Sequence, residues 1–256
     1  MGQRASYEPG NFCWVDLATT DVAAARDFYA EVFGWSDDGH PETGYTIFRK
    51  DGAAVAGLMP QSEEQARHGV GPAWTTYVCV QNADAAAARA AELGGSIGVP
   101  AFDLEATGRM AVVADPQGAV FALWQPGDFQ GAELVNEVGA WAWNDVQTTD
   151  VDGAATFYRE LFGWDIAEVP GSGGRYFSIS HGGRTIGGVM PAPPGVDRPS
   201  WSVYFGVDSA GAALERAEAA GGQRLVAPID VPAGRFAVAS DPLGAAFAVV
   251  DGDFDE

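Results

Sequence analysis

Positive charge is scarce in this 256-residue chain. It has 14 lysine and arginine residues against 35 aspartate and glutamate residues, which gives a net charge of −21, and Lys50 is its only lysine. Such a surface repels phosphate backbones, and no basic stripe offsets the repulsion. We therefore expect no nucleic-acid partner.

Cysteine and long apolar runs are equally scarce. The two cysteines, Cys13 and Cys79, form no motif, and we expect them to be reduced packing residues of a cytoplasmic protein. No apolar run approaches the roughly 18 residues that a membrane-spanning helix needs. The first residues lack the apolar core of a secretory signal. We expect no membrane partner.

A tandem repeat covers most of the chain. The segment WVDLATTDVAAARDFYAEVFGW, residues 14–35, matches WNDVQTTDVDGAATFYRELFGW, residues 143–164, at 13 of 22 positions. Later, GRMAVVADPQGAVFALW at 108–124 matches GRFAVASDPLGAAFAVV at 234–250. The repeat predicts two domains, 11–130 and 140–254. The linker at 131–139 contains little that would hold it rigid.

Each copy contains the same order of elements twice. A strand over residues 12–18 leads to a helix that Thr20 or Asp21 caps and Gly34 ends. A hairpin around Asp51 and Gly52 follows. After a polar loop the order strand, helix and three strands recurs to residue 124. Each copy is therefore predicted as two βαβββ modules, which makes the fold class α+β.

The motifs TTDVxxAxxFYxxxFGW and DPxGxxFAL resemble the vicinal oxygen chelate superfamily. That superfamily includes glyoxalase I, bleomycin-resistance proteins, extradiol dioxygenases and methylmalonyl-CoA epimerase. The resemblance covers residues 12–250 and is strongest to two-domain glyoxalase-like proteins of actinobacteria. It implies that the modules of each domain curl into an open, incomplete barrel whose hollow holds a ligand or a metal. The motif residues are core and turn residues, so they do not identify the chemistry.

The resemblance also places metal ligands at three positions per copy, normally His, Glu or Gln. These positions hold Trp14, Thr75 and Ala122 in the first copy and Trp143, Ser202 and Ala248 in the second. Indole and methyl groups offer a cation no lone pair, and hydroxyls are weak substitutes. The three histidines fall in predicted loops or turns: His40, His68 and His181. We predict no metal and no other cofactor; a cation shared by one aspartate from each copy is the alternative.

Strand alternation identifies one candidate acid per copy. Asp16 lies on the same face as Trp14, and Asp145 lies on the same face as Trp143, so both carboxyl groups should point into the hollow. Desolvation raises the pKa of such a carboxyl group, which suits proton abstraction beside a carbonyl. Asp16 and Asp145 are therefore candidate catalytic bases; a hydrogen bond to a tyrosine or a neighbouring strand is the alternative role.

The same alternation predicts a ligand-binding wall that is mainly aromatic and apolar, as in pockets for organic molecules. A slip of one residue would reverse it. The predicted wall consists of Phe12, Trp14, Thr75, Tyr77, Ala122, Trp124, Trp141, Trp143, Ser202, Tyr204 and Ala248.

Several functions fit these features, and all except the last involve binding of a small carbonyl or aromatic compound. The first is a metal-independent lyase, isomerase or cyclase. The second is a non-catalytic sequestration protein of the bleomycin-resistance type. The others are a metal-dependent glyoxalase or dioxygenase with a non-standard site, and a structural relic. We expect either a monomer whose halves pair as an internal pseudo-dimer, or a homodimer.

Overall fold

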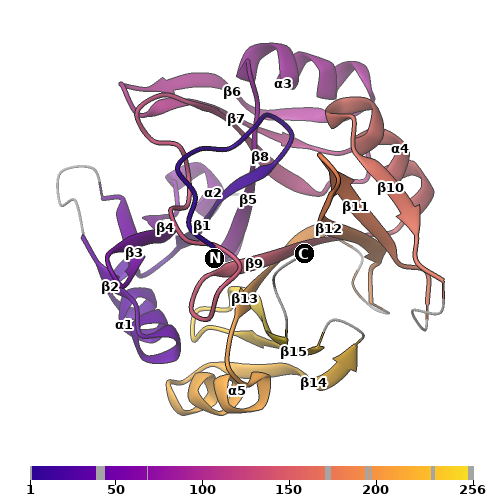
Figure 1. The fold of residues 1–256 in the computed structure, drawn as a ribbon. Helices are drawn as coiled ribbons and strands as arrows, with labels where there is room; N and C mark the ends of the chain where they lie inside the picture. Colours follow the sequence, from indigo (N-terminus) through magenta and orange to yellow (C-terminus); the bar gives the residue numbers. More distant parts are fainter. Residues whose placement is uncertain are drawn as a thin grey trace.

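The fold of the chain is taken from a computed structural model, which describes residues 2–38, 44–67, 69–170, 174–193, 196, 198–231 and 234–252. Copy one contains β1 (Phe12–Thr19), α1 (Val22–Phe33), β2 (Ser36–Asp37), β3 (Thr46–Lys50), β4 (Ala53–Pro60), α2 (Glu63–Arg67), β5 (Ala73–Cys79), α3 (Ala83–Glu92), β6 (Ser96–Leu104), β7 (Gly108–Ala114) and β8 (Val120–Pro126) (Figure 1).

Copy two repeats this order without a counterpart of α2 among the described residues. Its elements are β9 (Trp141–Thr148), α4 (Val151–Phe162), β10 (Asp165–Glu168), β11 (Phe177–His181), β12 (Arg184–Pro191), β13 (Ser200–Gly206), α5 (Ala210–Ala219), β14 (Gln223–Val231), β15 (Gly234–Ser240) and β16 (Ala246–Gly252). No helix of the described residues is long and apolar enough to cross a membrane.

Each copy forms one eight-stranded sheet. The strand orders are β2-β3-β4-β1-β5-β8-β7-β6 and β10-β11-β12-β9-β13-β16-β15-β14. At the centre of the first sheet, β1 runs parallel to β4 and antiparallel to β5, and β9 has the same relation to β12 and β13. Each sheet contains two βαβββ modules and does not close into a barrel. The predicted α+β fold of paired modules is therefore confirmed.

The predicted helix ends are confirmed as well. Asp21 is the N-cap of α1 and its side chain accepts a hydrogen bond from the backbone N–H of Ala24. Gly34 ends the helix in the left-handed conformation, with φ of 70°. Asp150 and Gly163 play the same parts at the two ends of α4. The repeated sequence therefore folds into repeated local structure.

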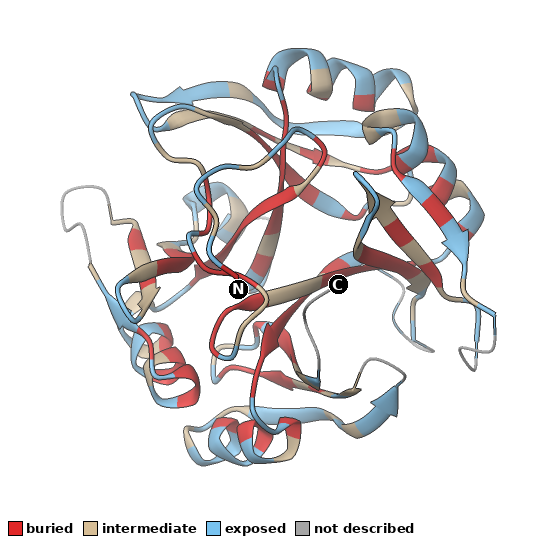
Figure 2. Cartoon of the chain, viewed as in Figure 1, coloured by how far each residue is buried: buried red, intermediate tan, exposed pale blue. Residues whose placement is uncertain are grey.

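The two copies pack through the faces of the sheets that carry the helices, which we call the helix faces. Helix α1, at the lower left of Figure 1, contacts α5 at the bottom, and α3, at the top, contacts α4 at the upper right. Figure 2 shows buried residues along the central strands and on the inward sides of these helices. Aromatic rings cross the junction: Phe33 of α1 packs 5.0 Å from Phe205 of β13, and Phe121 of β8 packs 5.7 Å from Tyr158 of α4.

The motifs shared by the two copies form reciprocal hydrogen bonds across this junction. Tyr29 donates to Asp241 at 3.3 Å, and Tyr158 donates to Asp115 at 3.0 Å. The indole of Trp35 donates to the carbonyl of Gly139 at 2.7 Å, and Trp164 donates to Gly10 at the same distance. The FYxxxFGW and DPxG motifs therefore hold the halves together as an internal pseudo-dimer.

The linker is held in place more firmly than its composition suggests. Ala132, Leu134 and Val135 are buried, and Leu134 forms a β-bridge with Gln3. The backbone N–H of Glu133 donates to the carbonyl of Ala54 at 2.8 Å. These contacts come from distant parts of the chain, so the composition of residues 131–139 alone could not predict them.

Candidate active site

A buried carboxylate with aromatic hydrogen-bond donors lies on the face of each sheet opposite the helices, which we call the open face. In copy one, Asp16 of β1 accepts a hydrogen bond from the hydroxyl of Tyr77 at 2.6 Å and one from Tyr45 at 3.3 Å. The indole of Trp14 donates to the Tyr45 hydroxyl at 2.8 Å. Asp16 is only 2% exposed.

Copy two repeats this arrangement with the equivalent residues. Asp145 of β9 accepts hydrogen bonds from the hydroxyl of Tyr176 and from the indole of Trp143, both at 2.9 Å. Tyr204 of β13 also donates to Asp145, which is 4% exposed. We call these four-residue groups cluster one (Trp14, Asp16, Tyr45 and Tyr77) and cluster two (Trp143, Asp145, Tyr176 and Tyr204).

A glycine beside each aspartate makes room for the cluster. Gly57 of β4 pairs with Asp16, and Gly188 of β12 pairs with Asp145. A Cβ atom added at Gly57 would lie 2.0 Å from the hydroxyl of Tyr45, and one at Gly188 would lie 2.1 Å from the hydroxyl of Tyr176. No side chain larger than glycine fits while the tyrosine keeps its place.

Burial controls the protonation of both aspartates. It raises the pKa of Asp16 from 3.8 to about 6, against the opposing effect of the hydrogen bonds from Tyr77 and Tyr45. Burial likewise raises the pKa of Asp145 above its ordinary value, and the bonds from Tyr176, Tyr204 and Trp143 oppose the rise. A carboxyl group with a pKa near neutrality can both take up and release a proton.

The structure places most of the predicted wall on the open faces. Thr75 and Ser202 lie directly across from Asp16 and Asp145 on the neighbouring strands. Residues that pair across neighbouring strands continue this face toward the outer edge of each sheet. In copy one they are, in strand order, Trp14, Tyr77, Ala122, Val112 and Val99. In copy two they are Trp143, Tyr204, Ala248, Val238 and Val226. Trp124 lies on the same face and packs 6.5 Å from Tyr77.

Two residues of the predicted wall lie elsewhere. A β-bulge shifts the register between Phe12 and Trp14, and an equivalent bulge follows Trp141. Phe12 consequently packs at the junction between the copies, 5.3 Å from Trp201 and 6.4 Å from Trp141. The prediction that Phe12 and Trp141 share the face of the aspartates is therefore wrong, because simple alternation does not hold through a bulge.

Tyr45 and Tyr176 are the site residues that strand alternation did not identify. They lie next to strands that are two places away from the aspartate strands in the sheet order. The repeat contains a usable signal, because six of the seven tyrosines form three equivalent pairs. The pairs are Tyr29 and Tyr158, Tyr45 and Tyr176, and Tyr77 and Tyr204.

The donor set does not fit a divalent metal. The six positions that resemble metal-ligand positions carry indole, hydroxyl and methyl groups, and nowhere in the described ranges do three His, Cys, Asp or Glu side chains gather in a group that could hold an ion. Among the described residues, Asp16 and Asp145 each accept hydrogen bonds from the tyrosines of their own copy and share no partner, which does not support a shared cation. His181 ends β11 and bonds to the carbonyl of Pro9 at 2.9 Å, whereas His40 and His68 lie outside the described residues.

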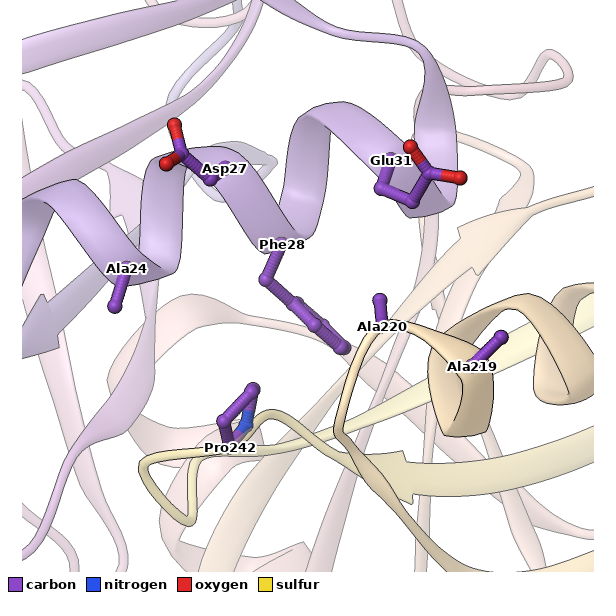
Figure 3. A pocket seen from close by; sticks show the side chains of 7 residues that line it. All are labelled: Ala24, Asp27, Phe28, Glu31, Ala219, Ala220 and Pro242. Carbon is purple, nitrogen blue, oxygen red and sulfur yellow. The ribbon is translucent and has the colours of Figure 1, made fainter.

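Two surface hollows lie at the junction of the copies, away from the clusters. The first, of about 470 Å³, lies between α1 and α5. Figure 3 shows the ring of Phe28 pointing from α1 toward Pro242 and Ala220, with Asp27 and Glu31 along the helix. The second, of about 320 Å³, lies beside the end of α1 and includes Lys50 and Arg216 in its lining. Neither hollow contains a residue of cluster one or cluster two.

Known proteins are similar in sequence to nearly the whole chain. The chain is 41% identical over 257 residues to "Putative glyoxylase CFP32" of Mycobacterium tuberculosis, covering 98% of each protein. It is 36% identical over 262 residues to "Anthracycline biosynthesis protein DnrV" of Streptomyces peucetius, covering 96% of this chain and 94% of that protein.

Solved structures share the fold at low sequence identity. The Mn(II)-bound glyoxalase of Novosphingobium aromaticivorans superimposes with a TM-score of 0.65 at 14% identity, covering 100% of this chain and 86% of that one. The 2,3-dioxygenase LapB of Pseudomonas sp. KL28 has the same TM-score at 13% identity, covering 98% and 94%. Residues 12–123 and 140–249 each match the "Glyoxalase/Bleomycin resistance protein/Dioxygenase superfamily", so the chain belongs to this superfamily, with two tandem domains.

Proposed function

We propose that this protein binds a small aromatic carbonyl compound on an open face and catalyses proton transfer next to the carbonyl without a metal. The observation that carries the proposal is the repetition of one carboxylate, two tyrosine hydroxyls and one indole at equivalent places in both copies. Each carboxylate is buried, and burial raises the pKa of both, that of Asp16 to about 6. Repeated burial of an acid is costly unless the acid is paired or used.

The chemistry requires two groups, and each cluster contains both. The carboxylate of Asp16 or Asp145 takes the proton from the carbon beside the carbonyl. Once the carboxyl group holds that proton, one tyrosine hydroxyl turns its hydrogen bond from the carboxyl group to the oxygen that becomes an enolate, which stabilises the developing charge. Return of the proton to another atom gives an isomerisation, and loss of a leaving group gives a lyase reaction.

The outer strands favour an apolar, flat ligand. On the open face of copy one, Phe102 and Leu104 of β6 are 40% and 39% exposed. In copy two, Ile229 and Val231 of β14 are 46% and 37% exposed. Apolar side chains that stay partly exposed on the same face of a sheet as a polar cluster are typical of a ligand-binding surface. The names of the relatives from Streptomyces also associate them with anthracyclines, which are polycyclic aromatic compounds with carbonyl groups.

Binding without turnover is the second candidate. It is favoured by the near-complete burial of both carboxylates and by the hydrogen bonds that each already accepts. In that case the clusters are structural, and the open faces serve only to hold the ligand, as in a sequestration protein.

One experiment separates the two candidates. The purified chain is titrated with 1-tetralone and 4-hydroxy-1-tetralone, both aromatic ketones, and exchange of the protons beside the carbonyl into D₂O is followed by NMR. The double variant Asp16→Asn and Asp145→Asn should retain affinity and lose at least about 100-fold in exchange rate, as expected when a general base is removed.

The matched control is the double variant Asp103→Asn and Asp230→Asn. These aspartates lie at equivalent exposed places and pair with Arg109 and Arg235. The control should exchange at the wild-type rate. Binding by the wild type with no exchange supports sequestration, and no binding of either ketone overturns both candidates.

A further inference from the structure

The two open faces differ, and the first is covered by the chain itself. The ring of Phe129, which follows β8, packs edge-on 4.9 Å from Trp14 and 6.1 Å from Trp124. The indole of Trp124 donates to the carbonyl of Phe129 at 3.1 Å, and the backbone N–H of Phe129 donates to Thr107. Trp14 is consequently buried. An aromatic ring of the protein thus lies where cluster one would meet an aromatic ligand.

The second open face has less to fill it among the described residues. Val250 occupies the position that Trp124 has in copy one, so the second open face lacks the indole that covers the first. Trp143 is half-buried, whereas Trp14 is buried. The residue that matches Phe129 in sequence is Phe254, which lies outside the described residues.

Copy two also carries a polar pair that copy one lacks. The side-chain amide of Gln147 donates to the hydroxyl of Ser202 at 3.0 Å, and both residues are half-buried. The equivalent residues of copy one are Ala18 and Thr75. Ser202 lies directly across from Asp145, so the pair adjoins cluster two.

The geometry of the pair leaves hydrogen-bonding capacity for a ligand. An amide that donates through nitrogen still has a carbonyl oxygen to accept a bond, and a hydroxyl that accepts one can still donate its proton. Within the part of the chain that the structure describes, no group bonds to the Gln147 Oε1 atom. The pair therefore presents one acceptor and one donor beside Asp145.

We infer that copy two is the ligand-binding half and that Gln147 and Ser202 recognise a hydroxyl group that the ligand carries on the same ring as its reacting carbonyl. Copy one keeps cluster one as part of its folded sheet, with its open face closed by Phe129 and Trp124. This inference rests on the proposed function and narrows the ligand class to hydroxylated aromatic ketones.

Calorimetric titration of the full chain with 4-hydroxy-1-tetralone and 1-tetralone tests the inference. The wild type should bind one equivalent of the hydroxylated ketone. Gln147→Ala, which installs the residue of copy one, should weaken binding of 4-hydroxy-1-tetralone at least tenfold and leave binding of 1-tetralone within twofold. Gln223→Ala, at an exposed glutamine that begins β14, is the matched control and should leave both affinities within twofold.

Tryptophan fluorescence gives an independent measurement that does not depend on the polar pair. Quenching by the bound ketone should be lost in Trp143→Phe and retained in Trp14→Phe. Two equivalents of ligand in the wild type, or equal losses of affinity in Gln147→Ala and Gln223→Ala, would overturn the inference while leaving the proposed function intact. Failure of both ketones to bind overturns the proposed function and the inference with it.

Discussion

Replacing Asp16 by asparagine measures directly how much the buried charge costs the folded protein. Burial raises the pKa of Asp16 from 3.8 to about 6. Between these two values the folded chain holds more protons at this site than the unfolded chain does. The contribution to stability is therefore complete below the unfolded pKa, falls as the pH rises, and is lost once the pH passes the folded pKa.

The size of the effect follows from the difference between the two pKa values. Each unit corresponds to about 1.4 kcal/mol, so ionisation of Asp16 lowers the free energy of unfolding by about 3 kcal/mol. Asparagine has the shape of the protonated acid and no charge, so it avoids this loss. The stability of Asp16→Asn relative to wild type should rise by about 2.5 kcal/mol between about pH 4 and about pH 7.5, because a small part of the effect has already occurred by pH 4.

Urea unfolding of both proteins across this pH range, followed by tryptophan fluorescence, gives the difference at each pH. The other carboxyl groups are common to both proteins and cancel in the comparison. Gln223→Ala, which removes an exposed side chain of β14 that has no titratable group, is the control and should show a constant difference. A difference for Asp16→Asn that stays flat from about pH 4 to about pH 7.5 would refute the reasoning, because the carboxyl group would then titrate alike in both states.

Three further predictions concern cluster two, the junction and metal binding. Gly188→Ala places a methyl group 2.1 Å from the Tyr176 hydroxyl and should lower the free energy of unfolding by about 1–3 kcal/mol in urea; unchanged stability would contradict the packing. Tyr158→Phe removes the donor to Asp115 at 3.0 Å and should cost about 1–3 kcal/mol in the same assay. Treatment with EDTA should change neither the free energy of unfolding nor the affinity for an aromatic ketone. A stoichiometric metal in the purified protein would show that this chain does hold a metal ion.

The fold could be predicted because its signals are local and repeated. The N-cap at Asp21, the helix end at Gly34 and the turn at Asp51 each depend on a few neighbouring residues, and the second copy confirms two of them at Asp150 and Gly163. The reciprocal bonds of Tyr29 and its equivalents were not predicted. These hydrogen bonds join motif residues of one copy to residues of the other copy. A repeated motif in the sequence does not show which residues its members contact.

The candidate site could be predicted in part, for a similar reason. Strand alternation correctly placed Asp16 on the face of Trp14, because no irregularity lies between them. It failed at Phe12, since the bulge depends on how β1 pairs with β5 rather than on the residues of β1. Strand alternation did not identify Tyr45, because Tyr45 directly precedes β3, and β4 lies between β3 and β1 in the sheet. Only the pairing of these strands brings the Tyr45 hydroxyl to Asp16.

Duplication within one chain explains how the open faces could diverge while the halves stay paired. The contacts that hold the halves together use the helix faces and the turns, through residues such as Tyr29 and Asp241. The differences between Ala18 and Gln147, or between Trp124 and Val250, lie on the open faces and touch none of these contacts. In a homodimer of a single-copy chain, every substitution would change both faces at once. In a tandem chain, side chains can cover one open face while the other open face gains ligand-binding residues, because each face has its own stretch of sequence.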